Sequence, residues 1–268
     1  MSSVPRSATS PQGDPLVTVA REGGIVRVTL NRPAQFNALS EGMMHAVQSE
    51  LQAIAADPDA RVVVLGAAGK AFCAGHDLRE MRASPSHDYY RTLFAQCARM
   101  MMTIQQLPQP VIARVHGIAT AAGCQLVAMC DLAVASADAK FAVSGVNLGL
   151  FCSTPAVALS RNLSRKAAFE MLVTGEFIDA PTAQARGLVN RVVAPEALDA
   201  EVDRIAASIC AKPAVAIAAG KGLFYRQLEM GIDAAYQLAG QTMACNMMDE
   251  SALEGVQAFI EKRPPDWK

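Results

Sequence analysis

From Leu16 onward, short apolar runs rich in β-branched residues alternate with longer stretches of helical periodicity. This alternation is typical of α/β proteins, in which helices pack against a sheet. The four residues 21–24 carry two glycines between two strand-like runs and predict a hairpin. Ser40 is the expected N-cap of a helix over 41–56, where apolar residues recur at helical spacing.

The same pattern predicts the other elements and a division of the chain into parts. We expect strands at 61–65, 111–115, 132–135 and 188–193, and helices at 87–106, 164–174 and 182–187. Residues 1–15 are rich in Ser and Pro and are expected to be a disordered lead-in. We therefore predict a core over 16–206 and, because no strand signal follows, a helical region over 207–268. The many apolar residues of that region indicate packing against the core or against another subunit.

Composition excludes several classes of function. The 268 residues have a net charge of -1 and no basic block, so nucleic acid is not an expected partner. Every apolar run is interrupted by polar residues before it reaches membrane-spanning length, so no membrane association is expected. Seven cysteines are scattered without a C-x-x-C pair, which favours reduced thiols, a cytoplasmic location and no metal site.

Two junctions between a strand and a loop carry the strongest chemical signal. Residues 66–81 read GAAGKAFCAGHDLREM, and residues 116–131 read HGIATAAGCQLVAMCD. In each, small residues allow a ligand to approach the backbone, and the second opens a buried helix whose first N–H groups lack helical partners. Two N–H groups that converge on one carbonyl oxygen would form an oxyanion hole.

These segments, together with NALS at 37–40, LVTGEFIDAPTAQARGLVNRVV at 172–193 and FIEKR at 259–263, resemble the enoyl-CoA hydratase/isomerase family, also called the crotonase family. The resemblance implies an α/β spiral of strand-strand-helix repeats and makes 207–268 a trimerisation region. It also implies a homotrimer or a dimer of trimers, and a role in fatty acid metabolism. An acyl-CoA thioester would be the substrate, with no separate cofactor.

The resemblance also assigns site residues. The backbone N–H groups of His76 and Ala122 would be the oxyanion donors, with a side-chain role for His76 the lesser alternative. The CoA groove would be formed by five residues, and the CoA phosphates would meet two cationic side chains. These residues are Asn37, Ala38, Ala74, Asp77 and Leu78 for the groove, and Arg79 and Lys262 for the phosphates.

The departures from the family pattern concern the acids. Hydratases of this family use two glutamates, at positions that fall on Gln125 and Gly145, and a third acid position of the family falls on Ser153. The resemblance implies that all three residues line the pocket. A positioned acid or base typically contributes about 10²- to 10⁴-fold to a rate. We therefore expect weak or absent hydration of crotonyl-CoA.

Three functions remain open at this point. The first is an acyl-CoA enzyme that depends mainly on its oxyanion hole, for example in decarboxylation or thioester cleavage. The second is a conventional hydratase or isomerase that uses a carboxylate from another segment. The third is a non-catalytic acyl-CoA binding protein. Asp77 and Asp131 are tempting acids, but we expect Asp77 to hold the first junction loop and Asp131 to bond nearby backbone.

Overall fold

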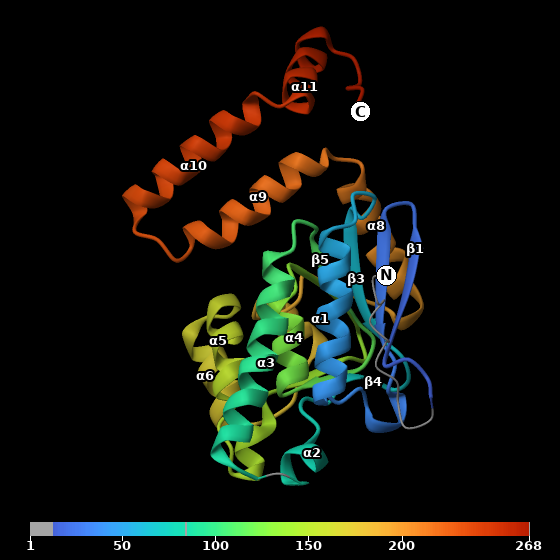
Figure 1. The fold of residues 1–268 in the computed structure, drawn as a ribbon, viewed down its shortest axis with the longest axis vertical. Coiled ribbons are helices and arrows are strands. Elements are labelled where there is room, and N and C mark those ends of the chain that lie inside the picture. The colour runs from blue at the N-terminus through green and yellow to red at the C-terminus, as the bar shows by residue number, and fades with distance from the viewer. Residues whose placement is uncertain (1–12, 84, 268) are drawn as a thin grey trace, which may run out of the picture.

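The computed structural model describes residues 13–83 and 85–267, which form two sheets surrounded by helices (Figure 1). The larger sheet has the strand order β1-β2-β3-β5-β7-β10, and the smaller one has the order β4-β6-β8-β9. The strands of the larger sheet are β1 (Val17–Glu22), β2 (Ile25–Leu30), β3 (Val62–Ala67), β5 (Val111–Val115), β7 (Leu132–Ser136) and β10 (Arg191–Val193). Those of the smaller sheet are β4 (Ala71–Cys73), β6 (Ile118–Thr120), β8 (Lys140–Ala142) and β9 (Ile178–Asp179).

After the β1–β2 hairpin and α1, three successive turns of the chain each contribute one strand to each sheet and then a helix, which confirms the expected spiral. β3 is followed by β4, β5 by β6 and β7 by β8, and strands from successive turns pair in parallel within each sheet. The helices that follow are α2 (Leu78–Ala83) and α3 (His87–Gln106) in the first turn, α4 (Ala122–Met129) in the second, and η2 (Ser144–Leu148), α5 (Ser153–Asn162) and α6 (Arg165–Thr174) in the third. The carboxyl ends of β4, β6 and β8 therefore lie side by side.

Helices cover both faces of the larger sheet. On one face α1 (Glu41–Ala55), α3 and α4 bury the main apolar core. On the other, α8 (Leu198–Cys210) packs Leu198, Val202 and Ala206 against Val64 and its neighbours. The remaining short helices are η1 (Pro33–Gln35), α7 (Ala180–Ala185) and η3 (Pro195–Ala197).

Three C-terminal helices project from this core (Figure 1). They are α9 (Ala214–Gln227), α10 (Ile232–Met247) and α11 (Glu250–Glu261), with α10 packed on α9 and α11 on α10. The boundary predicted at residue 207 falls inside α8, which belongs to the core because its apolar face is needed to cover the sheet. The projecting region begins only after Pro213.

Local signals located most elements within a few residues. The hairpin forms by antiparallel pairing of β1 with β2, and Gly23 and Gly24 adopt the positive φ that its turn requires. Ser40 caps α1 by accepting a hydrogen bond from Met43 N at 3.1 Å. The predicted lead-in, 1–15, lies outside the described residues except for its last three positions.

Within the described residues, no helix is both long enough and apolar enough to cross a membrane. The same part of the chain holds no group of three or more His, Cys, Asp or Glu side chains placed to bind a metal ion.

Candidate active site

A cavity of about 280 Å³ opens where β4, β6 and β8 end. Each strand contributes the residues that directly follow it, and α2, α3 and the start of α5 complete the wall. The wall is mainly apolar. It is lined by Ala74, His76, Leu78, Met81, Phe94, Ala121, Ala122, Ser144, Gly145, Leu148, Leu150, Phe151, Cys152, Ser153, Thr154 and Pro155.

Two glycines bring the two predicted junctions into contact at this cavity. A Cβ atom on Gly123 would lie 2.1 Å from the carbonyl oxygen of Cys73, so only glycine lets α4 approach β4 this closely. A Cβ on Gly75 would lie 3.3 Å from Ala122 N, and Gly75 has φ +91°. The backbone at His76 and the start of α4 are therefore neighbours, as the sequence predicted.

The backbone of His76 is held by a short parallel bridge to Leu39. Leu39 N donates to Gly75 O at 2.7 Å, and Asp77 N donates to Leu39 O at 3.3 Å. In such a bridge the N–H of the central residue points to the opposite side. The N–H of His76 therefore points away from Leu39.

Ala122 is the first residue of α4, so its N–H has no partner within the helix. The preceding residue, Ala121, has φ 51° and ψ −121°, which is unusual for a residue with a side chain and costs about 1–3 kcal/mol. Ala121 N donates to Ala142 O at 2.9 Å, which ties the strained residue to β8. His76 and Ala122 both line the cavity at this helix N-terminus, and backbone N–H groups directed into it would bind a carbonyl oxygen that gains negative charge.

Two of the three positions that lack the family acid lie in the cavity wall, and the third does not. Ser153 begins α5, and its hydroxyl donates to Phe151 O at 3.3 Å. Gly145 lies under the loop that follows η2: a Cβ there would be 2.4 Å from Leu150 O and 2.7 Å from Cys152 Sγ. Gly145 is therefore required by packing, and the backbone leaves no space for a side chain.

Gln125 does not line the cavity, contrary to expectation. It is buried on α4, and its Oε1 has no hydrogen-bond partner among the described residues.

The titratable groups of the wall are His76 and Cys152. Burial lowers the pKa of His76 below its ordinary value, and the Leu39 backbone offsets only part of this shift. The His76 ring packs edge-on against Phe94 with centroids 5.5 Å apart. Burial raises the pKa of Cys152, whose Sγ accepts a hydrogen bond from Gly145 N at 3.3 Å. Both groups are therefore neutral at neutral pH.

The structure changes the expected role of some CoA-groove residues. The side chain of Asn37 is fully buried, accepts from Arg32 N and donates to Ala68 O and Ala71 O, so it stabilises a turn and has no amide group left for a ligand. Ala38 is buried beside it, whereas Ala74 and Leu78 do line the cavity.

Asp77 holds the first junction loop, as predicted. It pairs with Arg32 at 2.7 Å and accepts hydrogen bonds from Arg79 N and Glu80 N at the start of α2. Partial burial by itself raises the pKa of Asp77, but the hydrogen bond from Arg32 and those from the α2 backbone outweigh it and the pKa is lowered. The Asp77 carboxylate therefore fixes the loop and is not available to a ligand.

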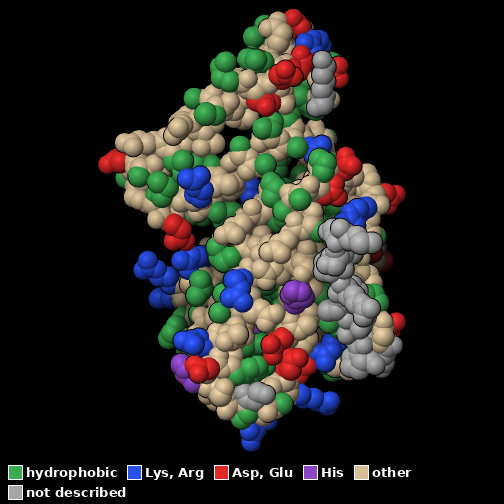
Figure 2. Space-filling model, viewed as in Figure 1, with side chains coloured by type: hydrophobic (Ala, Val, Ile, Leu, Met, Phe, Trp, Pro, Cys, Tyr) green, Lys and Arg blue, Asp and Glu red, His purple; other side chains and the backbone are tan. Residues whose placement is uncertain are grey.

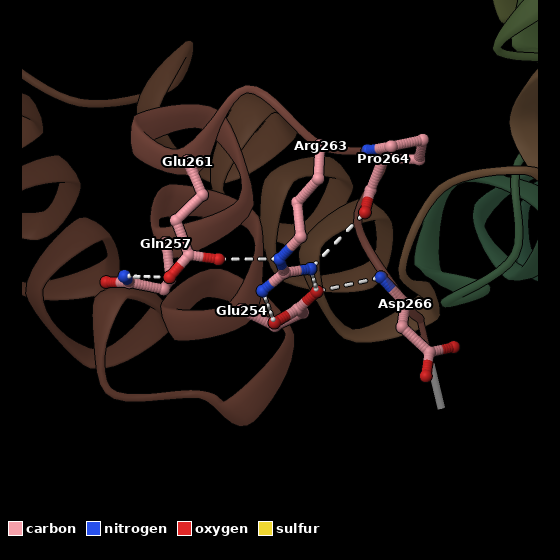
Figure 3. A network of polar contacts seen from close by, with 6 residues as sticks. All are labelled: Glu254, Gln257, Glu261, Arg263, Pro264 and Asp266. Carbon is pink, nitrogen blue, oxygen red and sulfur yellow. Dashed lines mark hydrogen bonds and ion pairs between the residues drawn. The ribbon is translucent and has the colours of Figure 1, made fainter.

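The two predicted phosphate-binding cations lie far apart in one chain. Arg79 is exposed on α2, near the cavity, whereas Lys262 follows α11 at the opposite end of the molecule (Figure 1). Next to Lys262, Arg263 pairs with Glu254 and Glu261, and this network folds the chain end back onto α11 (Figure 3). A single chain does not bring Lys262 to the cavity.

Many of the wall residues were not predicted from the sequence, among them four that come from four different helices. Met81, Phe94, Leu148 and Thr154 come from α2, α3, η2 and α5. Phe94 belongs to the helical stripe of α3, where a wall residue and a core residue have the same periodic signal.

The family model for enoyl-CoA hydratase/isomerase matches residues 20–268 of this sequence. The chain belongs to the enoyl-CoA hydratase/isomerase family. The enoyl-CoA hydratase domain-containing protein 3 of Xenopus laevis is 47% identical over 261 residues, which cover 97% of this chain and 89% of that protein. The 2,3-dehydroadipyl-CoA hydratase of Escherichia coli is 31% identical over 93% of this chain and 97% of its own.

Solved structures agree with this placement in the family. A structure described as the enoyl-CoA hydratase of Mycobacterium smegmatis has a TM-score of 0.94 at 65% identity, over 95% of this chain and 99% of that one. Human enoyl-CoA hydratase domain-containing protein 3 has a TM-score of 0.91 at 43% identity, over 94% and 100%. Residues 116–131 and 145–159 resemble this domain-containing protein 3 branch, and the relatives confirm that assignment.

The cytoplasmic location predicted from the cysteines is wrong, because the names of the relatives point to mitochondria. The domain-containing protein 3 relatives from Xenopus, rat and human are all named mitochondrial. Cysteine content indicates a reducing environment only, and it does not distinguish between reducing compartments.

Proposed function

We propose that this protein binds an acyl-CoA thioester in the cavity, polarises its carbonyl with the N–H groups of His76 and Ala122, and hydrates crotonyl-CoA weakly or not at all. The observation that supports the proposal is the contact between the two junctions at Gly75 and Gly123, beside an apolar cavity that both His76 and Ala122 line. Loss of one such donor typically costs about 2.7–4 kcal/mol of transition-state stabilisation. The CoA thioester is the substrate, and the reaction as proposed needs no separate cofactor.

The composition of the wall supports weak hydration. Among the described residues that line the cavity there is no Asp or Glu. Water addition needs one group to activate water and another to deliver a proton, and the neutral Gln125 amide can do neither. This favours an oxyanion-dependent enzyme over a conventional hydratase with a displaced carboxylate.

The same wall gives an indication of the acyl group. Leu78, Met81, Phe94, Leu148 and Phe151 offer apolar surface, and the part of the wall that the structure describes has no Lys or Arg side chain. A free carboxylate on the acyl group would be desolvated there without a cationic partner. We infer an uncharged, apolar acyl chain, which makes decarboxylation of a malonyl-type thioester the less favoured chemistry.

We further propose that the chain acts as a homo-oligomer. Along α10 and α11 the exposed fractions of Ile232, Tyr236, Met243 and Phe259 are 70%, 74%, 70% and 86%. Figure 2 shows hydrophobic side chains spread over these projecting helices. Apolar surface of this extent is typical of a subunit interface. Lys262 on α11 would reach a CoA phosphate only from a neighbouring subunit.

The test combines binding with turnover. Calorimetry with butyryl-CoA and crotonyl-CoA should show saturable binding, while hydration of crotonyl-CoA, followed by the loss of its enoyl absorbance, stays at least 100-fold below that of a hydratase carrying both glutamates. An Asp77→Asn variant, which loosens the loop without touching the wall, should weaken binding by a smaller factor than Ala122→Pro, which removes a donor N–H. Hydration at the rate of the two-glutamate enzyme would refute the proposal, as would the absence of any CoA thioester binding.

A further inference from the structure

The imidazole of His76 is an unusual component of an apolar wall. Both ring nitrogens are buried, and neither meets the distance and angle of a hydrogen bond to a described residue, although the Leu39 backbone lies near enough to raise the pKa of the ring slightly against the effect of burial. A buried polar group left without a partner costs about 1–3 kcal/mol. His116 is partly buried and also has an unpartnered Nδ1, but it differs because its Nε2 lies 2.9 Å from Gly69 O. The contacts of the His76 ring are therefore the Phe94 ring and the Leu39 backbone, and no side chain holds either of its nitrogens.

We propose that the His76 side chain is the proton carrier of this site and exchanges a proton with the carbon next to the thioester carbonyl. The inference rests on the proposed function, because the same residue would then supply a backbone donor to the carbonyl oxygen and a side-chain base to the adjacent carbon. His76 is one of two titratable residues in the described wall, and the other, Cys152, already accepts a hydrogen bond from Gly145 N.

The surroundings of His76 leave its ring neutral and basic. Phe94 of α3 packs on it, with Tyr90 stacked on Phe94. The nearest carboxylate in sequence, Asp77, is paired with Arg32. With burial as the main influence, the pKa of His76 lies below its ordinary value, so one ring nitrogen is unprotonated at neutral pH.

The proposed step conserves atoms and charge. The C–H bond at the α-carbon breaks, its proton passes to the unprotonated ring nitrogen, and the electron pair moves through the new C=C bond to the thioester oxygen. The N–H groups of His76 and Ala122 stabilise that oxygen while it carries the charge. Return of a proton from the imidazolium to carbon regenerates the thioester and the neutral ring, so no co-reactant is needed.

The experiment uses the full chain and butyryl-CoA, a saturated thioester that cannot be hydrated. Exchange of its α-hydrogens in D₂O is followed by mass spectrometry, and binding is measured in parallel by calorimetry. His76→Gln and His76→Phe both keep the backbone N–H and remove only the base. The matched control is His116→Gln, at a partly buried histidine whose pKa burial also lowers but which does not line the cavity.

We expect wild-type protein to exchange the α-hydrogens at a rate that rises with pH, has its midpoint below pH 6.5 and is constant between pH 7.5 and 8. Both His76 variants should lose at least 100-fold in exchange and keep butyryl-CoA affinity within about fivefold, since a positioned base is worth about 10²- to 10⁴-fold. The His116 variant should stay within threefold of wild type.

Other outcomes would overturn the proposal. Exchange that continues to rise through pH 9 would assign the base to Cys152, whose pKa is raised above 9.0. Wild-type protein that binds butyryl-CoA without exchange, or His76 variants that exchange normally, would show that the ring is structural. Failure of wild-type protein to bind butyryl-CoA would refute the proposed function itself. If one His76 variant does not fold, the other variant and the wild-type pH profile decide.

Discussion

A buried ion pair attaches the projecting helices to the core. On α9, Lys221 Nζ donates to Asp131 Oδ2 at 2.6 Å, and to Ile104 O and Gln109 O at 2.9 Å each. Asp131 also accepts hydrogen bonds from Val111 N at 2.6 Å and from the Tyr225 hydroxyl at 2.7 Å. The side chains of Lys221 and Asp131 are only 6% and 12% exposed. The expected structural role of Asp131 is therefore confirmed, with two further partners from α9.

We predict that Asp131→Asn destabilises the protein by about 3–5 kcal/mol, because it leaves the Lys221 ammonium buried without its counter-charge. That is a large part of the roughly 5–15 kcal/mol by which such proteins are stable. The measurement is urea unfolding followed by circular dichroism, at one low protein concentration so that self-association does not shift the midpoint. Hydrogen exchange of the α9 amides should accelerate most, since that helix loses its attachment.

Two further variants serve as the control and the rescue for Asp131→Asn. Glu229→Gln removes the exposed partner of Arg161, an ion pair of 3.0 Å that also joins the end of α9 to the core, and should cost at most about 1 kcal/mol. The double variant Asp131→Asn/Lys221→Met removes the unpaired ammonium and should recover part of the loss. The reasoning is refuted if Asp131→Asn and Glu229→Gln unfold at the same urea concentration, or if the double variant is the least stable of all.

Two further predictions concern the junctions and pH. Gly123→Ala should destabilise the folded protein by about 1–3 kcal/mol and reduce α-hydrogen exchange of butyryl-CoA at least tenfold, because the new Cβ would displace α4 from Cys73 O. An unchanged exchange rate would mean that the two junctions need not be in contact. Burial lowers the pKa of His76 and of His116 below the value of about 6.5 that a histidine has in the unfolded chain. Between each lowered pKa and pH 6.5 the unfolded chain therefore binds more protons than the folded protein, and the free energy of unfolding rises with pH. Urea midpoints from pH 5 to 7.5 should show this rise, and His76→Gln should reduce its slope without abolishing it; an identical slope in the variant would show that His76 titrates normally.

Much of the fold was predictable because its signals are local. Ser40 and Ser86 cap α1 and α3 by hydrogen bonds to backbone N–H groups three residues ahead, and such caps are encoded within four residues of sequence. The Gly23-Gly24 turn likewise determines the hairpin through its own positive φ angles. The two junctions were recognised because both carry small residues directly after a strand and, taken together, they resemble the family pattern.

The tertiary structure alone decided what the recognised positions do. In the sequence, Gly145 occupies the position of a family glutamate. In the structure, Leu150 O and Cys152 Sγ fill the space that a side chain would need, and they belong to a loop whose path no local pattern encodes. Asn37 resembles a groove residue, yet its amide is used by Ala68 O and Ala71 O across a turn. The sequence by itself determined the strands of the larger sheet, several of the longer helices and the pair of junctions, because capping, periodicity and turn chemistry act over a few residues. It did not predict the short strands β4, β6, β8 and β9, which form the smaller sheet. Only the tertiary structure placed His76 in the cavity wall and left Gln125 buried outside it, because burial and hydrogen-bond partners depend on segments far apart in the chain.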